Sequence, residues 1–207
     1  WLWDGIGSLF VPRSAYAVTD GWNAIGSCEW RVADNVLVIR PADGVPEGTL
    51  FLDPHVYRYP WNADDVKDTF ESVRIEGIVH APRYFNDFLV GCSNLRHVDL
   101  NGLDTSGSTQ ISDVLERCYS LDYVDLSMLD CSGCDHLDSL VNNIVCDTLD
   151  ISGLTIRNAY QVIYYSDIAK IVGDGVKLVG TCKAFRQMNK PCEFVLTNLD
   201  LSECTNL

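Results

Sequence analysis

The chain of 207 residues has little positive charge and no long apolar stretch, and these two shortages exclude several classes of protein. It carries 15 Lys and Arg against 29 Asp and Glu, which gives a formal net charge of −14 at pH 7. Binding to nucleic acid or to an anionic membrane surface depends on basic residues, so both functions are disfavoured. No run approaches the roughly 20 apolar residues of a membrane-spanning helix. We therefore expect no nucleic-acid partner and no membrane insertion of this chain.

Sequence motifs for catalysis are missing as well. The patterns G-x-S-x-G, G-x-x-x-x-G-K-[ST], H-E-x-x-H and G-x-G-x-x-G do not occur, so nucleophilic, phosphate-binding and metalloprotease chemistry have no support. The four histidines, at positions 55, 80, 97 and 136, are scattered and make no metal-binding spacing. We therefore expect a protein that is not an enzyme and has no cofactor and no metal site.

What the sequence does contain is an internal repeat. Segment 92–104 (CSNLRHVDLNGLD) is echoed by segment 118–130 (CYSLDYVDLSMLD), and a third copy resumes the motif at Leu149 after a slightly shorter interval. A fourth copy is degraded, and a fifth is expected to begin near Cys192 because segment 199–202 (LDLS) restores the motif. A fixed period in the mid-twenties with Leu-x-x-Val-x-Leu-x-x-Leu spacing is typical of a leucine-rich-repeat solenoid.

Each repeat is expected to contain one strand and one short helix. In the first repeat Val98 and Leu100 point inward and Asp99 points outward, as in a half-buried strand. Segment 111–115 is apolar at positions i, i+3 and i+4, which predicts a short amphipathic helix, and segment 137–141 repeats that spacing. Stacked units of this kind bury a continuous core. The prediction is an α/β leucine-rich-repeat solenoid with a parallel strand face and short helices opposite.

The part of the chain before the repeats is organised differently. Residues 1–20 include an apolar stretch that ends in Ala15-Tyr16-Ala17, the small-x-small pattern that signal peptidase accepts, so they are the remnant of a secretory leader or an ordinary or disordered N-terminus. Two apolar runs, 28–32 and 36–40, are joined by a polar turn and predict a hairpin. We interpret residues 21–81 as a β-rich N-terminal cap that shields the first repeat from water, followed by repeats over 82–207 that stop within a repeat.

An ordered series of short motifs resembles the BspA-type leucine-rich-repeat surface proteins of bacteria. The motifs are GSCEW (26–30), VLVIRPADG (36–44), PW (60–61), IEGIVHAP (75–82), GCSNL (91–95) and VDLNGLDTS (98–106). The resemblance covers residues 21 to 207, but the usual Asp-Met-x-x-Met-Phe helix is replaced in this chain. It implies a secreted or cell-surface protein with a role in adhesion to host proteins or other cells, and it implies no catalysis.

A row of acidic residues is the candidate binding site. Asp99, Asp125 and Asp150 occupy the same outward position of successive strands and are expected to stack about 5 Å apart, with Asp200 in that position of a later repeat. Adjacent carboxylates repel one another, so a basic ligand surface or a cation could relieve them. Alternatively, neighbouring Ser, Thr and backbone groups hydrogen-bond them in a solvated ladder, which screening by water and salt favours. Tyr123, on one of these strands, is a further candidate contact.

The nine cysteines do not resemble a compact disulfide framework. Cys92 and Cys118 are one repeat period apart, so we interpret them as small buried core residues, although stacked neighbours would also lie within disulfide distance. Cys131 and Cys134 form a C-x-x-C motif that could hold zinc or act in redox chemistry. No second C-x-x-C motif and no well-placed His support it, so a repeat turn is favoured.

Two functions from different classes follow from these patterns. The first is an extracellular binding module that holds a host or bacterial surface protein on its strand face, because solenoids use extended surfaces to bind macromolecules. The net charge of −14 favours a partner with a basic patch. The second is a structural spacer, in which the repeats project another domain from the cell surface and bind nothing themselves.

Overall fold

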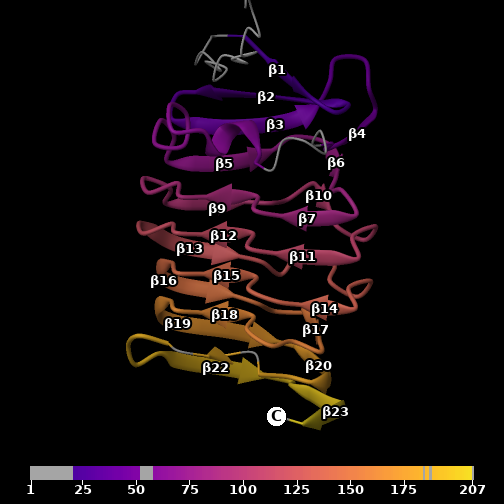
Figure 1. Cartoon of the computed structure of the whole chain (residues 1–207), viewed down its shortest axis with the longest axis vertical. Coiled ribbons are helices and arrows are strands. Elements are labelled where there is room, and N and C mark those ends of the chain that lie inside the picture. The colour runs from indigo at the N-terminus through magenta and orange to yellow at the C-terminus, as the bar shows by residue number, and fades with distance from the viewer. Residues whose placement is uncertain (1–20, 52–57, 184, 187, 207) are drawn as a thin grey trace, which may run out of the picture.

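The structure is a computed structural model that describes residues 21–51, 58–183, 185–186 and 188–206. Within this part the chain winds as a parallel β-solenoid, in which each turn of the chain, called a coil below, stacks on the previous one (Figure 1). The solenoid architecture expected from the repeat is therefore present. The small-x-small pattern at 15–17 lies outside the described residues.

One nine-stranded sheet, the long sheet, runs along the stack of coils that the described residues form. Its strand order is β1-β2-β3-β5-β9-β13-β16-β19-β22, with antiparallel pairing among the first three strands and parallel pairing from β3 onward. Its strands are β1 (Asn23–Ile25), β2 (Cys28–Ala33), β3 (Val36–Pro41), β5 (Ser72–Ile75), β9 (His97–Asp99), β13 (Leu121–Asp125), β16 (Val145–Asp150), β19 (Asp167–Asp174) and β22 (Glu193–Thr197).

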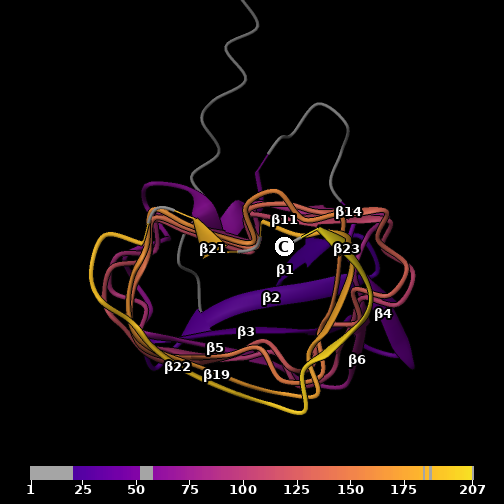
Figure 2. The same cartoon turned by 90° about the horizontal axis from the view of Figure 1, so that it is seen from below.

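Two further walls close the coils around the core (Figure 2). The lateral wall holds two three-stranded sheets, made of β4 (Glu47–Thr49), β6 (Ile78–His80) and β10 (Leu103–Asp104), and of β17 (Thr155–Arg157), β20 (Lys177–Thr181) and β23 (Asp200–Asn206). The stepped wall, opposite the long sheet, holds β7 (Tyr84–Asn86), β11 (Gln110–Ser112) and β14 (His136–Leu137), and next to them β8 (Leu89–Val90), β12 (Leu115–Glu116), β15 (Val141–Asn142), β18 (Ile163–Tyr164) and β21 (Phe185–Arg186).

The predicted N-terminal hairpin is confirmed. Strands β2 and β3 pair in antiparallel fashion, and the two turn residues Asp34 and Asn35 have φ angles of 51° and 62°. A two-residue turn of this type needs positive φ at both positions, which Asp and Asn tolerate better than other side chains. Strand β3 then pairs in parallel with β5, so the hairpin forms the first layers of the long sheet.

The predicted buried row is also confirmed. Val98, Val124 and Leu149 are register partners on successive strands, and all three are buried. Ile171 continues the row in the next coil. Because each side chain packs between equivalent side chains of its two neighbours, the apolar repeat in the sequence becomes a continuous column of the core.

The predicted helices are wrong, and the fold is a β-solenoid rather than an α/β solenoid. Ile111 lies in β11 and Leu115 in β12, and between them Asp113 has a φ of 47°. Ser139, with a φ of 50°, separates β14 from β15 in the same way. A left-handed residue between two short strands turns the chain, so Ile111, Val114 and Leu115 are all buried. The i, i+3, i+4 spacing therefore arises from a kink. Apart from one 3₁₀ turn, η1 (Pro60–Asn62), the described residues contain no helix.

The later coils are shorter than the early ones, which explains the irregular fourth repeat. Along the long sheet, the chain takes fewer residues to pass from Leu149 to its partner Ile171 than from Val124 to its partner Leu149. The next long-sheet strand is β22, and Asp200 instead begins β23 in the lateral wall, where it is the register partner of Lys177. The expectation that Asp200 occupies the same strand position as Asp99, Asp125 and Asp150 is therefore wrong, because a short motif does not identify the wall on which it lies.

The described residues include no helix long and apolar enough to span a membrane.

Candidate functional site

The predicted acidic row lies on the outer face of the long sheet. Asp99, Asp125 and Asp150 are the last residues of β9, β13 and β16. Asp125 and Asp150 are register partners, and the pairing of Val98 with Val124 brings Asp99 beside Asp125. Asp99 is exposed, whereas Asp125 and Asp150 are only partly exposed. The structure therefore brings these three predicted residues together in one row.

Each carboxylate in the row caps the turn that leaves the long sheet. The backbone N–H of Asn101 donates to Oδ1 of Asp99 over 3.0 Å, and the N–H of Ser127 donates to Oδ1 of Asp125 over 2.8 Å. An Asp that accepts a hydrogen bond from the backbone two residues ahead stabilises a turn. The same bond recurs at Asp104, Asp130, Asp150 and Asp200, whose partners are Ser106, Ser132, Ser152 and Ser202. These contacts support the solvated-ladder interpretation and give the row a structural role.

A hydrogen bond links Tyr123 to the acidic residue of the next coil, Asp150. Its hydroxyl donates a hydrogen bond to Oδ2 of Asp150 over 3.1 Å, although 46% of the residue stays exposed. Partial burial, followed by this hydrogen bond, raises the pKa of Tyr123 to about 12, so the hydroxyl stays a donor at neutral pH. His97 and Thr148 are its register partners on the neighbouring strands. The result is an exposed ring fixed in place beside the carboxylates.

Basic residues that the sequence analysis did not single out share this face. Arg96 donates three hydrogen bonds to the carboxylate of Asp122, with lengths between 2.9 and 3.2 Å. Arg74 is the register partner of Asp99, and Lys170 lies 3.7 Å from Glu193. The outer face of the long sheet is therefore mixed in charge rather than uniformly acidic. The sequence does contain a signal for this ion pair. Arg96 and Asp122 are one repeat period apart, and residues at that separation are neighbours in a solenoid.

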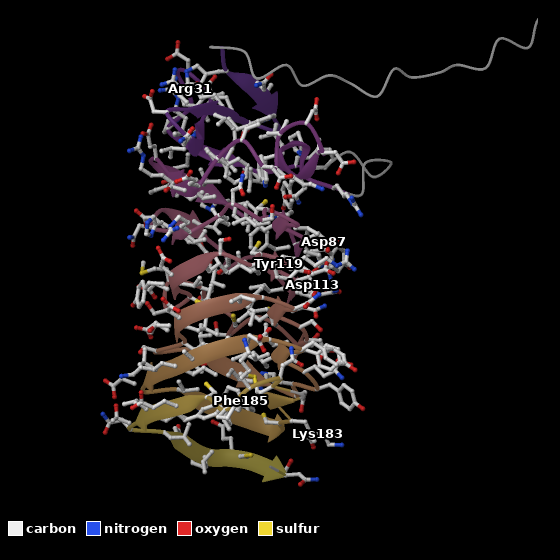
Figure 3. All side chains as sticks on the ribbon, turned by 90° about the vertical axis from the view of Figure 1, so that its left-hand side faces the viewer. Arg31, Asp87, Asp113, Tyr119, Lys183 and Phe185 are labelled. Carbon is white, nitrogen blue, oxygen red and sulfur yellow. The ribbon has the colours of Figure 1, made fainter. Side chains whose placement is uncertain are left out.

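At the N-terminal end of the same face, two guanidinium groups stack on one indole ring. The Cζ atoms of Arg31 and Arg40 lie 4.5 Å and 3.7 Å from the ring centroid of Trp22. Arg40 also forms an ion pair of 2.6 Å with Glu29. Figure 3 shows Arg31 on the edge of the molecule opposite Asp113, which lies between β11 and β12 of the stepped wall.

The C-x-x-C motif is a repeat turn, as favoured from the sequence. The N–H of Cys134 donates to the carbonyl of Cys131 over 3.1 Å, and Ser108 makes the equivalent bond to Thr105 over 2.9 Å one coil earlier. Burial raises the pKa of Cys131 to about 12 and that of Cys134 to about 11, which disfavours the reactive thiolate. Within the described ranges no group of three or more His, Cys, Asp or Glu side chains could hold a metal ion.

The repeat cysteines are core residues, as expected. Cys92 and Cys118 are free thiols and fully buried. A hydrogen bond with Cys118, together with burial, raises the pKa of Cys92 far above its usual value. All nine cysteines are free in this structure.

Two clefts lie on the stepped wall, away from every predicted site residue. One has a volume of about 420 Å³, and its lining consists of Arg83, Tyr84, Thr109, Gln110, Ser112, Asp135 and Asp138. The other has a volume of about 460 Å³, and its lining consists of Glu116, Arg117, Asn142, Asn143, Tyr164, Tyr165 and Asn189. Neither cleft is predicted by the sequence, because its apolar spacing indicated helices on this wall, and a helix would have directed these side chains differently.

No family model, no curated protein and no solved structure matches the chain. The resemblance to BspA-type proteins stays a prediction from the motifs.

Proposed function

We propose that the protein is an extracellular binding module that holds a protein partner against the outer face of the long sheet. The observation that carries the proposal is the exposed ring of Tyr123, fixed by its hydrogen bond to Asp150 in the middle of a rigid parallel sheet. Tyr and Arg are enriched at the energetic centres of protein interfaces, and Arg96 lies on the same face. The extracellular location rests on the resemblance to bacterial surface proteins.

The charge of the chain indicates the chemistry of the partner. A net charge of −14 attracts a partner with a basic patch and repels an acidic one. Asp99 is exposed on this face and Asp122 is partly exposed, although Asp99 also caps a turn and Asp122 is paired with Arg96. Attraction between exposed charges is screened over roughly 8 Å at physiological ionic strength. Binding should therefore weaken as salt is added.

The test is a capture experiment with variants that keep the fold. Immobilised protein is screened against extracellular-matrix and bacterial-surface extracts, and the captured protein is identified and measured again in pure form. Tyr123→Ala removes the ring, and the triple variant Asp99→Asn/Asp125→Asn/Asp150→Asn removes charge but keeps an oxygen acceptor for each turn. Tyr84→Ala, on the stepped wall, is the matched control because Tyr84 is 59% exposed.

We expect the purified partner to bind at least about tenfold more weakly to Tyr123→Ala and to the triple variant, whereas Tyr84→Ala binds like the parent. Equal binding by all four proteins at low and high salt would place the site elsewhere.

A structural spacer is the second candidate, and one observation favours it. Each carboxylate of the acidic row is already used to cap a turn, so the fold alone accounts for the row. Capture of no protein at any salt concentration, by a parent whose fold is intact, would support the spacer.

A further inference from the structure

We propose that the second cleft of the stepped wall, which Tyr164 and Tyr165 line, binds a neutral oligosaccharide. The cleft, called the tyrosine–asparagine groove below, has a volume of about 460 Å³ and crosses strands β12, β15 and β18. Its lining consists of Glu116, Arg117, Asn142, Asn143, Tyr164, Tyr165 and Asn189. It lies on the wall opposite the long sheet, so it is separate from the protein-binding face proposed above (Figure 2).

The groove is made of two ladders of side chains. Glu116, Asn142 and Tyr164 are register partners on the three strands, so neighbouring members are one coil apart, about 4.8 Å. The residue that follows each of them, Arg117, Asn143 or Tyr165, forms the second ladder. A lining that repeats at this interval suits a ligand that is itself a short polymer, because one hexose residue is of comparable length.

The second ladder is held in a left-handed backbone conformation. The φ angles of Arg117, Asn143 and Tyr165 are 55°, 54° and 49°, and Gly91, one coil earlier, has a φ of 71°. Gly and Asn adopt this conformation readily, whereas a bulky Tyr or Arg does so at a cost in free energy. Strain of this kind at a surface position is typical of functional sites. At Tyr165 it accompanies an exposed ring, 43% accessible, beside the ring of Tyr164 at a centroid distance of 4.2 Å.

The polar groups of the groove are already oriented. The Nδ2 of Asn143 donates to the hydroxyl of Tyr119 over 3.2 Å, and the Nδ2 of Asn189 donates to the carbonyl of Tyr165 over 2.9 Å. The Nδ2 of Asn142 lies 3.4 Å from Oδ1 of Asp113. An amide offers both a donor and an acceptor, which matches the paired hydroxyls of a sugar. Side chains fixed before binding lose less conformational entropy when a ligand arrives.

The ring and the charges of the groove select the class of sugar. The exposed face of Tyr165 can pack against the apolar C–H face of a pyranose, as aromatic rings do with apolar surface. Glu116 and Arg117 lie 3.3 Å apart, so the carboxylate and the guanidinium neutralise each other. The net charge of −14 also repels sulfated or sialylated chains. A neutral oligosaccharide is therefore favoured over an anionic one.

A peptide strand fits the groove less well. Peptides that bind by strand addition use the unpaired edge of a sheet. Here β12, β15 and β18 each pair with a neighbour on both sides, so their backbone groups are already occupied. Recognition must come from side chains, and the lining consists of amides, tyrosines and one ion pair.

The proposal is tested on an array of neutral gluco-, galacto-, manno- and N-acetylhexosamine oligosaccharides, with sialylated and sulfated chains as separate arms. The strongest neutral tetrasaccharide is then titrated into the protein in a calorimeter. Tyr165→Asn removes the ring and places at this position the residue type that Asn143 already shows in the same backbone conformation. Asn142→Ala removes one amide. Tyr123→Ala, on the long sheet, is the control because its exposure of 46% is close to that of Tyr165.

We expect neutral oligosaccharides to be bound, with affinity at least about tenfold lower in Tyr165→Asn and Asn142→Ala and unchanged in Tyr123→Ala. Tyr165→Asn should unfold at a urea concentration no lower than the parent, which shows that lost binding is not lost folding. Failure to bind any neutral oligosaccharide at millimolar concentration, selective binding of anionic chains, or equal affinity in Tyr165→Asn would overturn the proposal. None of these outcomes bears on the long-sheet face.

Discussion

The N-terminal layers and the later coils share one long sheet but fill their cores with different side chains. In the N-terminal layers the rings of Trp30, Tyr59, Trp61, Phe85 and Phe88 pack against one another at centroid distances between 4.8 and 6.4 Å. In the later coils the core is made mainly of Leu, Ile, Val and Cys at repeating positions. Identical coils can be filled by side chains of similar size, whereas the irregular first layers need large rings to fill an uneven space.

The two ends of the sheet also differ. At the N-terminal end the hairpin of β1 and β2 covers the first layers, and Trp30 is buried. At the other end β22 is the last described strand of the sheet, and Phe194 is 44% exposed although it is the register partner of the buried Ile171. The repeat sequence therefore specifies which side chains point inward, while burial depends on a neighbouring layer on each side.

The largest effect is expected in the aromatic layers. Trp61→Ala should lower the free energy of unfolding by about 3 to 5 kcal/mol, because Trp61 is fully buried and its indole N–H donates to the carbonyl of Phe88 over 2.7 Å. Urea unfolding followed by circular dichroism measures the change. Tyr84→Ala, at an exposed position, should cost less than about 1 kcal/mol and serves as the control. Similar losses in both variants would show that the aromatic cluster does not stabilise the N-terminal layers.

A substitution in the aliphatic column should have a comparable or smaller effect. Leu126→Ala is expected to cost about 2 to 5 kcal/mol, because Leu126 is fully buried between neighbouring coils. The same substitution at Leu201, which is 42% exposed in β23, should cost much less. The two variants, compared by urea unfolding, separate the interior of the stack from its last described layer. An unchanged midpoint for Leu126→Ala would contradict its burial.

The acidic row should respond to hydrogen bonding more than to charge. Asp125→Ala is expected to cost about 0.5 to 1.5 kcal/mol, because the N–H of Ser127 loses its acceptor. Asp125→Asn keeps an oxygen acceptor and removes repulsion from Asp150, so its stability should equal or slightly exceed that of the parent. Thermal unfolding of the three proteins distinguishes the two roles. Equal stabilities of the Ala and Asn variants would argue against the capping bond.

The smallest expected effect is a change of stability with pH in the lateral wall. Strand β6 pairs there with β4 on one side and with β10 on the other. Hydrogen bonds of His80 with Glu47 (3.1 Å) and Asp104 (2.7 Å) raise the pKa of His80 above its usual value near 6.5. Because the pKa of His80 is higher in the folded than in the unfolded protein, the protonated imidazole stabilises the fold. This contribution is fully present below about pH 6.5 and is lost as the pH rises through the folded pKa. The melting temperature of the parent should therefore fall more between about pH 6 and about pH 9 than that of His80→Gln.

Protonation of Asp104 weakens its interaction with His80 at low pH. Hydrogen bonds from Ser106, with a smaller effect of His80, lower the pKa of Asp104, so its contribution is present above its ordinary value near 3.8 and is lost as pH falls. Identical pH profiles for the parent and His80→Gln would show that His80 does not tie β4, β6 and β10 together.

The candidate site was predicted only in part, and particular residues show why. The position of Asp99, Asp125 and Asp150 followed from a period that places equivalent residues side by side. Their turn-capping bonds to Asn101, Ser127 and Ser152 depend on backbone geometry after the strand. The tyrosine–asparagine groove was missed because residues 111–115 show the same apolar spacing for a helix as for two strands joined by a left-handed residue.

The sequence by itself determined the solenoid, the column of Val98, Val124 and Leu149, the hairpin of β2 and β3, and the turn at Cys131 and Cys134, because each depends on local turn chemistry or on the repeat period. Only the tertiary structure decided that the stepped wall is built of strands, that Asp200 lies on the lateral wall, and that two ladders of exposed side chains form a groove. The position of Asp200 depends on the length of the later coils, whereas the stepped wall and its groove depend on the φ angle of single residues such as Asp113 and Tyr165. Neighbouring coils select that angle by packing and hydrogen bonding, and no pattern of apolar residues encodes it.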